Sequence, residues 1–368
     1  MKRVLSLLLT MSMLFTFAAC GTKDPVPVTS ENTEQNTDSV EDPTPITLQN
    51  ADGGTIEEIS TIANGRFCDI ITERTDGKLT IEWFPAGQLG SLAESAEALT
   101  IGTMDLAKVD PSLIGQYSPV TELLSLPFLI KDFEHADKVL NGDVGDMIAK
   151  QIEEDCGIIV LSWLFVGFRN FCTKTPITSV SDCKDILLRS PEGQIYMDTF
   201  NLLNMKPTPL PYGEMYTAMQ TGVVDAVETT PEVIYTSEFY KLGKYVCVSN
   251  HMFTTNFIGI NADLFYSLPQ EWQDLLREVG EEVAADEQED IIANADMWYE
   301  KLANDGAVIT EFDNYQELID LFTPYWEEAA ERIGGNAQDI VEAIISRIAK
   351  AAKVSANMSF TVLCELII

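Results

Sequence analysis

Two arginines stand where the sequence otherwise looks like buried strand. Arg169 ends the apolar run of LFVGFRN (164–170), and Arg189 follows three aliphatic residues in ILLRSP (186–191). Arginine is scarce, because the 368 residues include eight arginines against 58 acidic residues. A guanidinium presents parallel N–H donors that fit a carboxylate, and it is costly to bury unpaired. Each arginine must therefore pair with an Asp or Glu of this chain or with an anionic ligand, and position alone favours the internal ion pair.

The surroundings of the two arginines suggest where they lie in the fold. Gly167 lets backbone or ligand approach closely just before Arg169, and Pro191 ends the second run just after Arg189. We therefore expect both guanidiniums to emerge at strand ends, where α/β proteins hold ligands in a crevice.

Helices and short apolar strands alternate along the chain, which predicts an α/β architecture. A long helix, begun by a proline and ended by a glycine, is expected at 269–306 and would form a spine between two lobes. The remaining helical spacing is at 55–77, 91–102, 134–157 and 213–222, and strand-like runs are at 78–85, 104–109, 158–166 and 223–229.

Signatures of catalysis and of metal binding are missing from the sequence. It has no GxSxG, HExxH, P-loop or GxGxxG motif, and carboxylate pairs do not stand out in so acidic a chain. His135 and His251 are the only histidines, and we interpret both as structural. Six cysteines beyond Cys20 form no CxxC pair, so buried thiols are favoured over disulfides, and neither a metal nor a cofactor is expected.

Composition and charge narrow the class of protein. Hydrophobic residues make up 46% of the chain, which is long enough for two domains or one large domain. The net charge of -35 argues against nucleic acid as a partner, because phosphate binding needs a basic surface.

The N-terminus predicts export. Residues 1–20 combine Lys2 and Arg3 with an apolar run and end in Ala-Ala-Cys, which is typical of a bacterial lipoprotein signal peptide with lipid on Cys20. An ordinary signal peptide cut near Ala19 is the alternative. Residues 21–45 are rich in Pro, Thr, Asp and Glu and are expected to be a disordered tether. No other segment approaches the ~20 apolar residues of a membrane helix.

An ordered set of motifs gives the function a sharper form. In order along the chain they are FPAGQLGSLAESAEALTIGTMDLA (84–107), LPFLIKDFEHADKVLNGDVG (126–145), GFRNF (167–171), LLRSPEG (187–193), PTPLPYGEMYTAMQTGVVDAVE (207–228) and SNH (249–251). Together they resemble the DctP-type solute-binding proteins of tripartite ATP-independent periplasmic (TRAP) transporters, over about 46–335.

This resemblance implies a two-lobed, periplasmic-binding-protein-like receptor that closes around a small organic acid and passes it to an ion-gradient-driven membrane transporter. Crossing strands would form the hinge. Lobe I is expected at 46–166 with 256–295, and lobe II at 167–255 with 296–350. The tail, 351–368, has no counterpart in the family pattern and ends strongly apolar.

The resemblance also implies ligand-binding residues. Arg189 matches the arginine that grips the ligand carboxylate, and Arg169 matches a second arginine that supports it. Tyr212 falls at an aromatic position of the pocket, and Asp110 at an acidic or polar one. Thr229 replaces the family's asparagine, since VDAVETTP stands where VDGQENP is usual. Through a first-strand loop, the resemblance adds Asn50 and Asp52.

Two further departures bear on ligand identity. Ser91-Leu92 stands where an acidic pair is often found, and KDILLRSP replaces KGLKIRVP. Acidic groups in the pocket would suit hydroxyls or an amine, so hydroxylated sugar acids fit somewhat better than plain dicarboxylates. The alternatives are a receptor of an ATP-driven importer or a sensor kinase, an exported hydrolase or lyase, and a structural surface lipoprotein.

Overall fold

The computed structural model describes residues 44–349. The predicted signal peptide, Cys20, nearly all of the tether, Cys364 and the tail 351–368 lie outside the described residues. Between residues 44 and 349, no helix combines the length and apolarity needed to cross a membrane.

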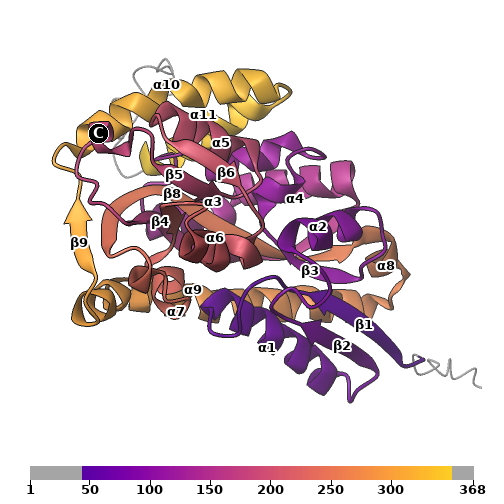
Figure 1. Cartoon of the computed structure of the whole chain (residues 1–368). Helices are drawn as coiled ribbons and strands as arrows, with labels where there is room; N and C mark the ends of the chain where they lie inside the picture. Colours follow the sequence, from indigo (N-terminus) through magenta and orange to yellow (C-terminus); the bar gives the residue numbers. More distant parts are fainter. Residues whose placement is uncertain (1–43, 350–368) are drawn as a thin grey trace, which may run out of the picture. The chain divides into compact units, whose positions relative to one another are not determined.

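Two long antiparallel strands, β4 (Ile158–Thr173) and β8 (Tyr245–Asn261), form the centre of a single sheet. Within residues 44–349 the sheet order is β2-β1-β3-β8-β4-β7-β5-β6, with β9 paired to β8 (Figure 1). The shorter strands are β1 (Ile46–Ala51), β2 (Leu79–Phe84), β3 (Leu106–Val109), β5 (Leu187–Ser190), β6 (Lys206–Pro209), β7 (Ala226–Thr229) and β9 (Val308–Glu311).

The short strands gather at opposite ends of the long pair. β3 pairs with 257–260 of β8, whereas β7 pairs with 170–173 of β4. One end therefore carries the parallel group β3-β1-β2 and the other the parallel group β7-β5-β6. The predicted α/β class and the crossing strands are confirmed, because β4 and β8 run from one group to the other.

Helix α9 (Gln270–Asn304) confirms the predicted spine helix. It packs along β4 and against α1 and α7, elements that belong to different ends of the sheet (Figure 1). The other helices are α1 (Ile59–Arg74), α2 (Leu92–Thr100), α3 (Phe133–Leu140), α4 (Asp143–Cys156), α5 (Gln194–Leu202), α6 (Met215–Thr221), α7 (Pro231–Thr236), α8 (Ala262–Ser267), α10 (Tyr315–Ile333) and α11 (Ala337–Ala349), with short 3₁₀ turns η1 (Pro111–Ile114), η2 (Pro119–Ser125), η3 (Val180–Cys183), η4 (Tyr212–Glu214) and η5 (Phe239–Lys241).

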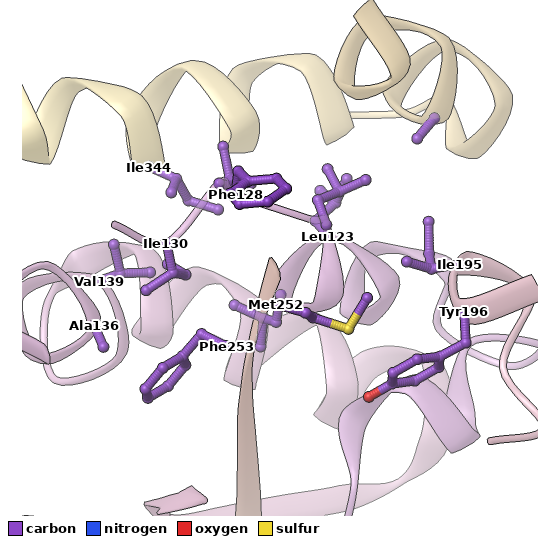
Figure 2. Packing of buried hydrophobic residues seen from close by; sticks show 14 of the residues in the cluster. Leu123, Phe128, Ile130, Ala136, Val139, Ile195, Tyr196, Met252, Phe253 and Ile344 are labelled. Atoms are coloured by element: carbon purple, nitrogen blue, oxygen red, sulfur yellow. The ribbon is translucent and has the colours of Figure 1, made fainter. Parts of the chain in front are cut away.

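The largest apolar cluster joins segments from both predicted lobes. Leu123 and Phe128 lie in the same cluster as Ile195 and as Ile344 of α11, as Figure 2 shows. Trp326 of α10 is fully buried there and donates its indole N–H to the carbonyl of Pro127, at 2.7 Å. Helices α10 and α11 therefore tie the C-terminal part of the described chain to η2 and α3.

One detail differs from the sequence-based expectation. Arg169 does not stand at a strand end, because β4 continues past 166 to Thr173. The glycine that suggested an end instead has a φ of 109° and sits at a shift of register between Phe165 and Gly167, which the strand accommodates.

The cysteines and one histidine have the structural roles that the sequence suggested. Five cysteines are buried and free, namely Cys68, Cys156, Cys172, Cys183 and Cys247. His135 is buried, and its Nε2 lies 2.8 Å from the carbonyl oxygen of Ile344.

Candidate functional site

A small cavity of about 60 Å³ lies where the carboxyl ends of β3, β5 and β7 meet. The group β3-β1-β2 and the group β7-β5-β6 run in opposite directions along β4 and β8, so the carboxyl ends of the two groups point toward each other. The carboxyl ends of strands are where open α/β sheets bind ligands. Its walls come from both predicted lobes, with 91–113 on one side and 169–229 on the other. The lining residues are Ser91, Leu92, Ala93, Asp110, Leu113, Arg169, Arg189, Pro191, Glu192, Pro211, Tyr212 and Thr229.

Arg189 is the cation of this cavity that has no carboxylate partner among residues 44–349. Its side chain is 4% exposed, and its Nε and Nη2 both donate to the carbonyl oxygen of Leu210, at 2.9 and 2.6 Å. Burial lowers the pKa of Arg189 to about 10, and the nearby charge of Arg169 acts in the same direction. Since Leu210 occupies the Nε edge, the Nη1–Nη2 edge remains available for an anion.

Arg169 is already paired. Its Nε and Nη2 form a fork on the Glu228 carboxylate, with Nη2 to Oε1 at 2.7 Å, and Nη1 donates to Thr254 Oγ1 at 3.2 Å. Burial opposes the charge on Arg169, but Glu228 outweighs it and the pKa of Arg169 is raised. Of the two partners that the sequence allowed, Arg169 takes the internal carboxylate while still lining the cavity.

A buried chain of polar groups continues behind Glu228. His251 Nε2 lies 3.5 Å from Glu228 Oε2, and His251 Nδ1 lies 2.8 Å from Ser249 Oγ. Although this order of groups superficially resembles a hydrolytic triad, neither Ser249 nor His251 lines the cavity. Burial lowers the pKa of His251, and its Nε2, although close to Glu228, has no hydrogen-bond partner among residues 44–349.

Three further predicted residues line the cavity with oxygen atoms. Asp110 follows β3, and its Oδ1 accepts hydrogen bonds from the backbone N–H and hydroxyl of Ser112, at 2.9 and 2.7 Å. Within the described chain no hydrogen bond reaches Asp110 Oδ2, and burial raises the pKa of this carboxyl group. Thr229 ends β7, and Tyr212 donates its hydroxyl to Glu58 Oε1 at 2.7 Å.

The structure does not bring Asn50 and Asp52 to this cavity. Asn50 is fully buried in β1 and donates to Asn64 Oδ1 at 2.8 Å. Asp52 forms a buried ion pair with Lys108, at 3.0 Å between Oδ1 and Nζ. Both residues therefore have partners inside the chain, next to the site rather than in its lining.

Sequence reasoning missed the first turn of α2. The Ser91 hydroxyl oxygen accepts a hydrogen bond from the Glu94 N–H, and the Glu94 carboxylate accepts one from the Ser91 N–H. Leu92 and Ala93, the first residues of this helix, line the cavity. The helix supplies no acceptor for their N–H groups, and such groups at a helix N-terminus favour negative charge. The signal was present in SLAE, an S-x-x-E capping box.

These contacts define a class of protein. The crevice offers one unpaired guanidinium, helix N–H groups and several oxygen atoms, so it can hold the carboxylate of a polar small molecule. Among residues 44–349 there is no cluster of three or more His, Cys, Asp or Glu side chains that could hold a metal. The fold and the site are those of a two-domain α/β receptor for an anionic solute.

Comparison with known proteins identifies the family. The model of the bacterial extracellular solute-binding proteins, family 7 (DctP), matches residues 56–332. The chain is 30% identical to the 2,3-diketo-L-gulonate-binding periplasmic protein YiaO of Escherichia coli, over 58% of this chain and 66% of that protein. It is 28% identical to the C4-dicarboxylate-binding periplasmic protein DctP of Rhodobacter capsulatus, over 76% and 84%.

A solved structure agrees with this assignment. The TRAP periplasmic solute-binding protein of Bradyrhizobium sp. BTAi1, in complex with D-galacturonate, superposes with a TM-score of 0.76 at 26% identity. The match covers 81% of this chain and 99% of that one. The chain belongs to the DctP family of TRAP solute-binding proteins, and it is an extracytoplasmic receptor for organic acids rather than an enzyme.

Proposed function

We propose that this receptor binds a hydroxylated organic acid with a single carboxylate, and that Arg189 grips this carboxylate. The observation that carries the proposal is the buried guanidinium of Arg189, which faces the cavity without a carboxylate partner among residues 44–349. A ligand supplies the missing charge. In a crevice sheltered from water, such a charge-assisted pair contributes more than on the surface.

The charges around the cavity favour one carboxylate over two. Arg169 and Glu228 cancel each other, which leaves Arg189 as the unpaired positive charge. Asp110 on the opposite wall would repel a second carboxylate, but its Oδ2 suits a ligand hydroxyl. Relatives whose names mention 2,3-diketo-L-gulonate and D-galacturonate are consistent with a sugar acid here.

Ligand entry should require movement of the walls. A volume of about 60 Å³ is well below the roughly 300–1,000 Å³ of typical ligand pockets. The two walls belong to different predicted lobes, and we propose that bending at β4 and β8 separates them. The hydrogen bond from Tyr212 to Glu58 then marks the closed arrangement, because it joins the two predicted lobes.

The proposal includes an anchor and a destination. We propose that Cys20 carries the lipid that tethers the receptor to the outer face of the membrane, and that the loaded receptor delivers its acid to TRAP membrane subunits. The signal sequence supports the anchor, and membership of the family supports the partner.

A thermal-shift screen of the purified protein tests the ligand class. The panel should pair uronates and aldonates with C4-dicarboxylates, keto acids and amino acids. A ligand at a hundredfold its dissociation constant should stabilise the protein by about 2.7 kcal/mol. We expect stabilisation by hydroxylated monocarboxylates. Stabilisation by dicarboxylates alone, or by none of the acids after unfolding and refolding to remove bound ligand, would contradict the proposal.

A further inference from the structure

A second cavity, of about 140 Å³, shares no lining residue with the arginine cavity. It lies against 166–168 of β4, the start of α7 and 291–299 of α9. We call the second cavity the hinge pocket, because it lies against β4, the strand that we propose bends. The two cavities are close in the chain, since Thr229 lines the first and Thr230 lines the second. Its chemically distinctive lining residues are Phe133, Phe168, Glu232, Asp296, Trp298 and Tyr299.

We propose that the hinge pocket is a separate binding site for a small organic ammonium ion. This proposal goes beyond the carboxylate site and does not depend on it.

Glu232 supplies a buried carboxylate with one unoccupied oxygen. The residue is 4% exposed, and its Oε1 accepts a hydrogen bond from the N–H of Ile59 at 2.8 Å. Among residues 44–349 no hydrogen bond to Oε2 is present, and no Lys, Arg or His lines the pocket. The carboxylate thus lines a cavity without a cation to neutralise it.

The charges that face Glu232 do not provide that cation. Glu58 approaches from the start of α1 and Glu287 from α9, and both are acidic. Lys108 of β3 is the nearby cation, but its Nζ is bound to Asp52 at 3.0 Å. Burial, followed by the repulsion from Glu58, raises the pKa of Glu232 to about 7. A cation bound in the pocket would favour the ionised carboxylate and lower this pKa, so its binding should depend on pH.

Aromatic walls select an organic cation over a metal ion. Phe133, Phe168, Trp298 and Tyr299 line the pocket, and aromatic faces attract ammonium groups, most strongly at tryptophan. One contact of this kind is present within the chain, since Lys301 Nζ lies 4.2 Å from the centre of the Trp298 ring, so a ligand would share this ring with Lys301. The volume also fits a small ligand, since a cavity of about 150 Å³ admits a molecule the size of benzene.

The test is a titration with choline, compared with 3,3-dimethyl-1-butanol, its uncharged analogue of the same shape. Calorimetry on the purified protein measures the affinity for choline and for the alcohol. The ionic strength is held constant, because the net charge of -35 attracts all cations weakly. We expect choline to bind at least about tenfold more tightly than the alcohol. Binding should strengthen between pH 6 and pH 8, as Glu232 loses its proton.

Variants locate the site. Glu232→Gln and Trp298→Ala should each weaken choline binding about tenfold. Two matched controls on the exposed surface of α9, Glu300→Gln and Ile292→Ala, should leave it unchanged, as should Arg189→Met. Melting temperatures confirm folding, and Asp296→Asn is a milder second variant.

Three results would overturn the proposal. The first is no measurable binding of choline. The second is equal affinity for choline and the alcohol, which would indicate a merely apolar cavity. The third is an equal effect of site and control variants, which would indicate counterions held by the surface charge.

Discussion

Replacement of Arg189 by methionine should strongly weaken carboxylate binding while changing the stability of the free protein little. In the ligand-free protein this guanidinium makes two hydrogen bonds, both to Leu210 O, and has no carboxylate partner among the described residues. Removing it relieves the cost of burying a charge but leaves the Leu210 carbonyl without its donors, at a cost of about 1–3 kcal/mol. These effects oppose each other, so the free energy of unfolding should change by about 1 kcal/mol or less.

Ligand binding should respond quite differently. The Nη1–Nη2 edge can donate two charge-assisted hydrogen bonds, each contributing about 1.5–3 kcal/mol. A total loss of about 3–6 kcal/mol corresponds to a dissociation constant about 10²- to 10⁴-fold larger. Arg189→Lys should fall between, because lysine keeps the charge and loses the fork.

Calorimetry with the best acid from the screen measures the affinity, and urea unfolding measures stability. The matched control is Arg66→Met, since Arg66 pairs with Asp286 at 2.7 Å on the surface, where both side chains are about half exposed. This control should leave both quantities unchanged, because exposed ion pairs contribute little. If Arg189→Met folds and binds the acid within about threefold of the original affinity, the assignment of Arg189 is wrong.

Three other predictions concern stability, and urea unfolding measures each. Glu228→Gln should lower the free energy of unfolding by about 3–5 kcal/mol, because Arg169 is left buried without its counter-charge; a loss below about 1 kcal/mol would contradict this. The raised pKa of Glu232, about 7, means that the folded state holds a proton the unfolded state has released, so stability falls as pH rises from about 4.5 to 7. Glu232→Gln should match the original protein at about pH 4 and exceed it by up to about 3 kcal/mol at pH 8, whereas parallel curves would rule out this titration. Gly145→Ala should lower the free energy of unfolding by about 1–3 kcal/mol or more, because the new Cβ would lie 1.9 Å from the carbonyl oxygen of Leu140. An unchanged midpoint of urea unfolding would show that α4 can shift to make room.

Local patterns predicted the elements near the motifs and the spine helix, but they did not predict β8, α10 or α11. The spine helix was expected at 269–306 and spans Gln270–Asn304, because a proline and a glycine limit its long apolar periodicity. The end of β4 was harder to place. A glycine normally weakens a strand, but pairing with β8 on one side and β7 on the other carries β4 past Gly167.

Site residues were predictable where they lie at the end of a strand. They were unpredictable where a partner from a distant part of the chain determines whether the side chain faces the cavity. Asp110 follows β3, whereas Thr229 and Arg189 lie at the ends of β7 and β5; the carboxyl ends of these two groups of strands point toward each other, so the three residues meet in the cavity. Asp52 also follows a strand, yet Lys108 from β3 holds it in a buried pair. The sequence around Asp52 contains no signal for its ion-pair partner, Lys108, which lies 56 positions away.

The two arginines also show that local sequence does not reveal the partner of a buried charged residue. Both follow apolar runs, both are nearly fully buried, and both line the cavity, so local sequence treats them alike. What separates them is the pairing of β4 with β7, which sets Phe171 opposite Glu228 and brings that carboxylate onto Arg169. β5, which carries Arg189, lies between β7 and β6, and the acceptor that Arg189 finds is the backbone carbonyl of Leu210, just after β6. Strand order therefore assigns one arginine to the scaffold of the site and leaves the charge of the other for a ligand.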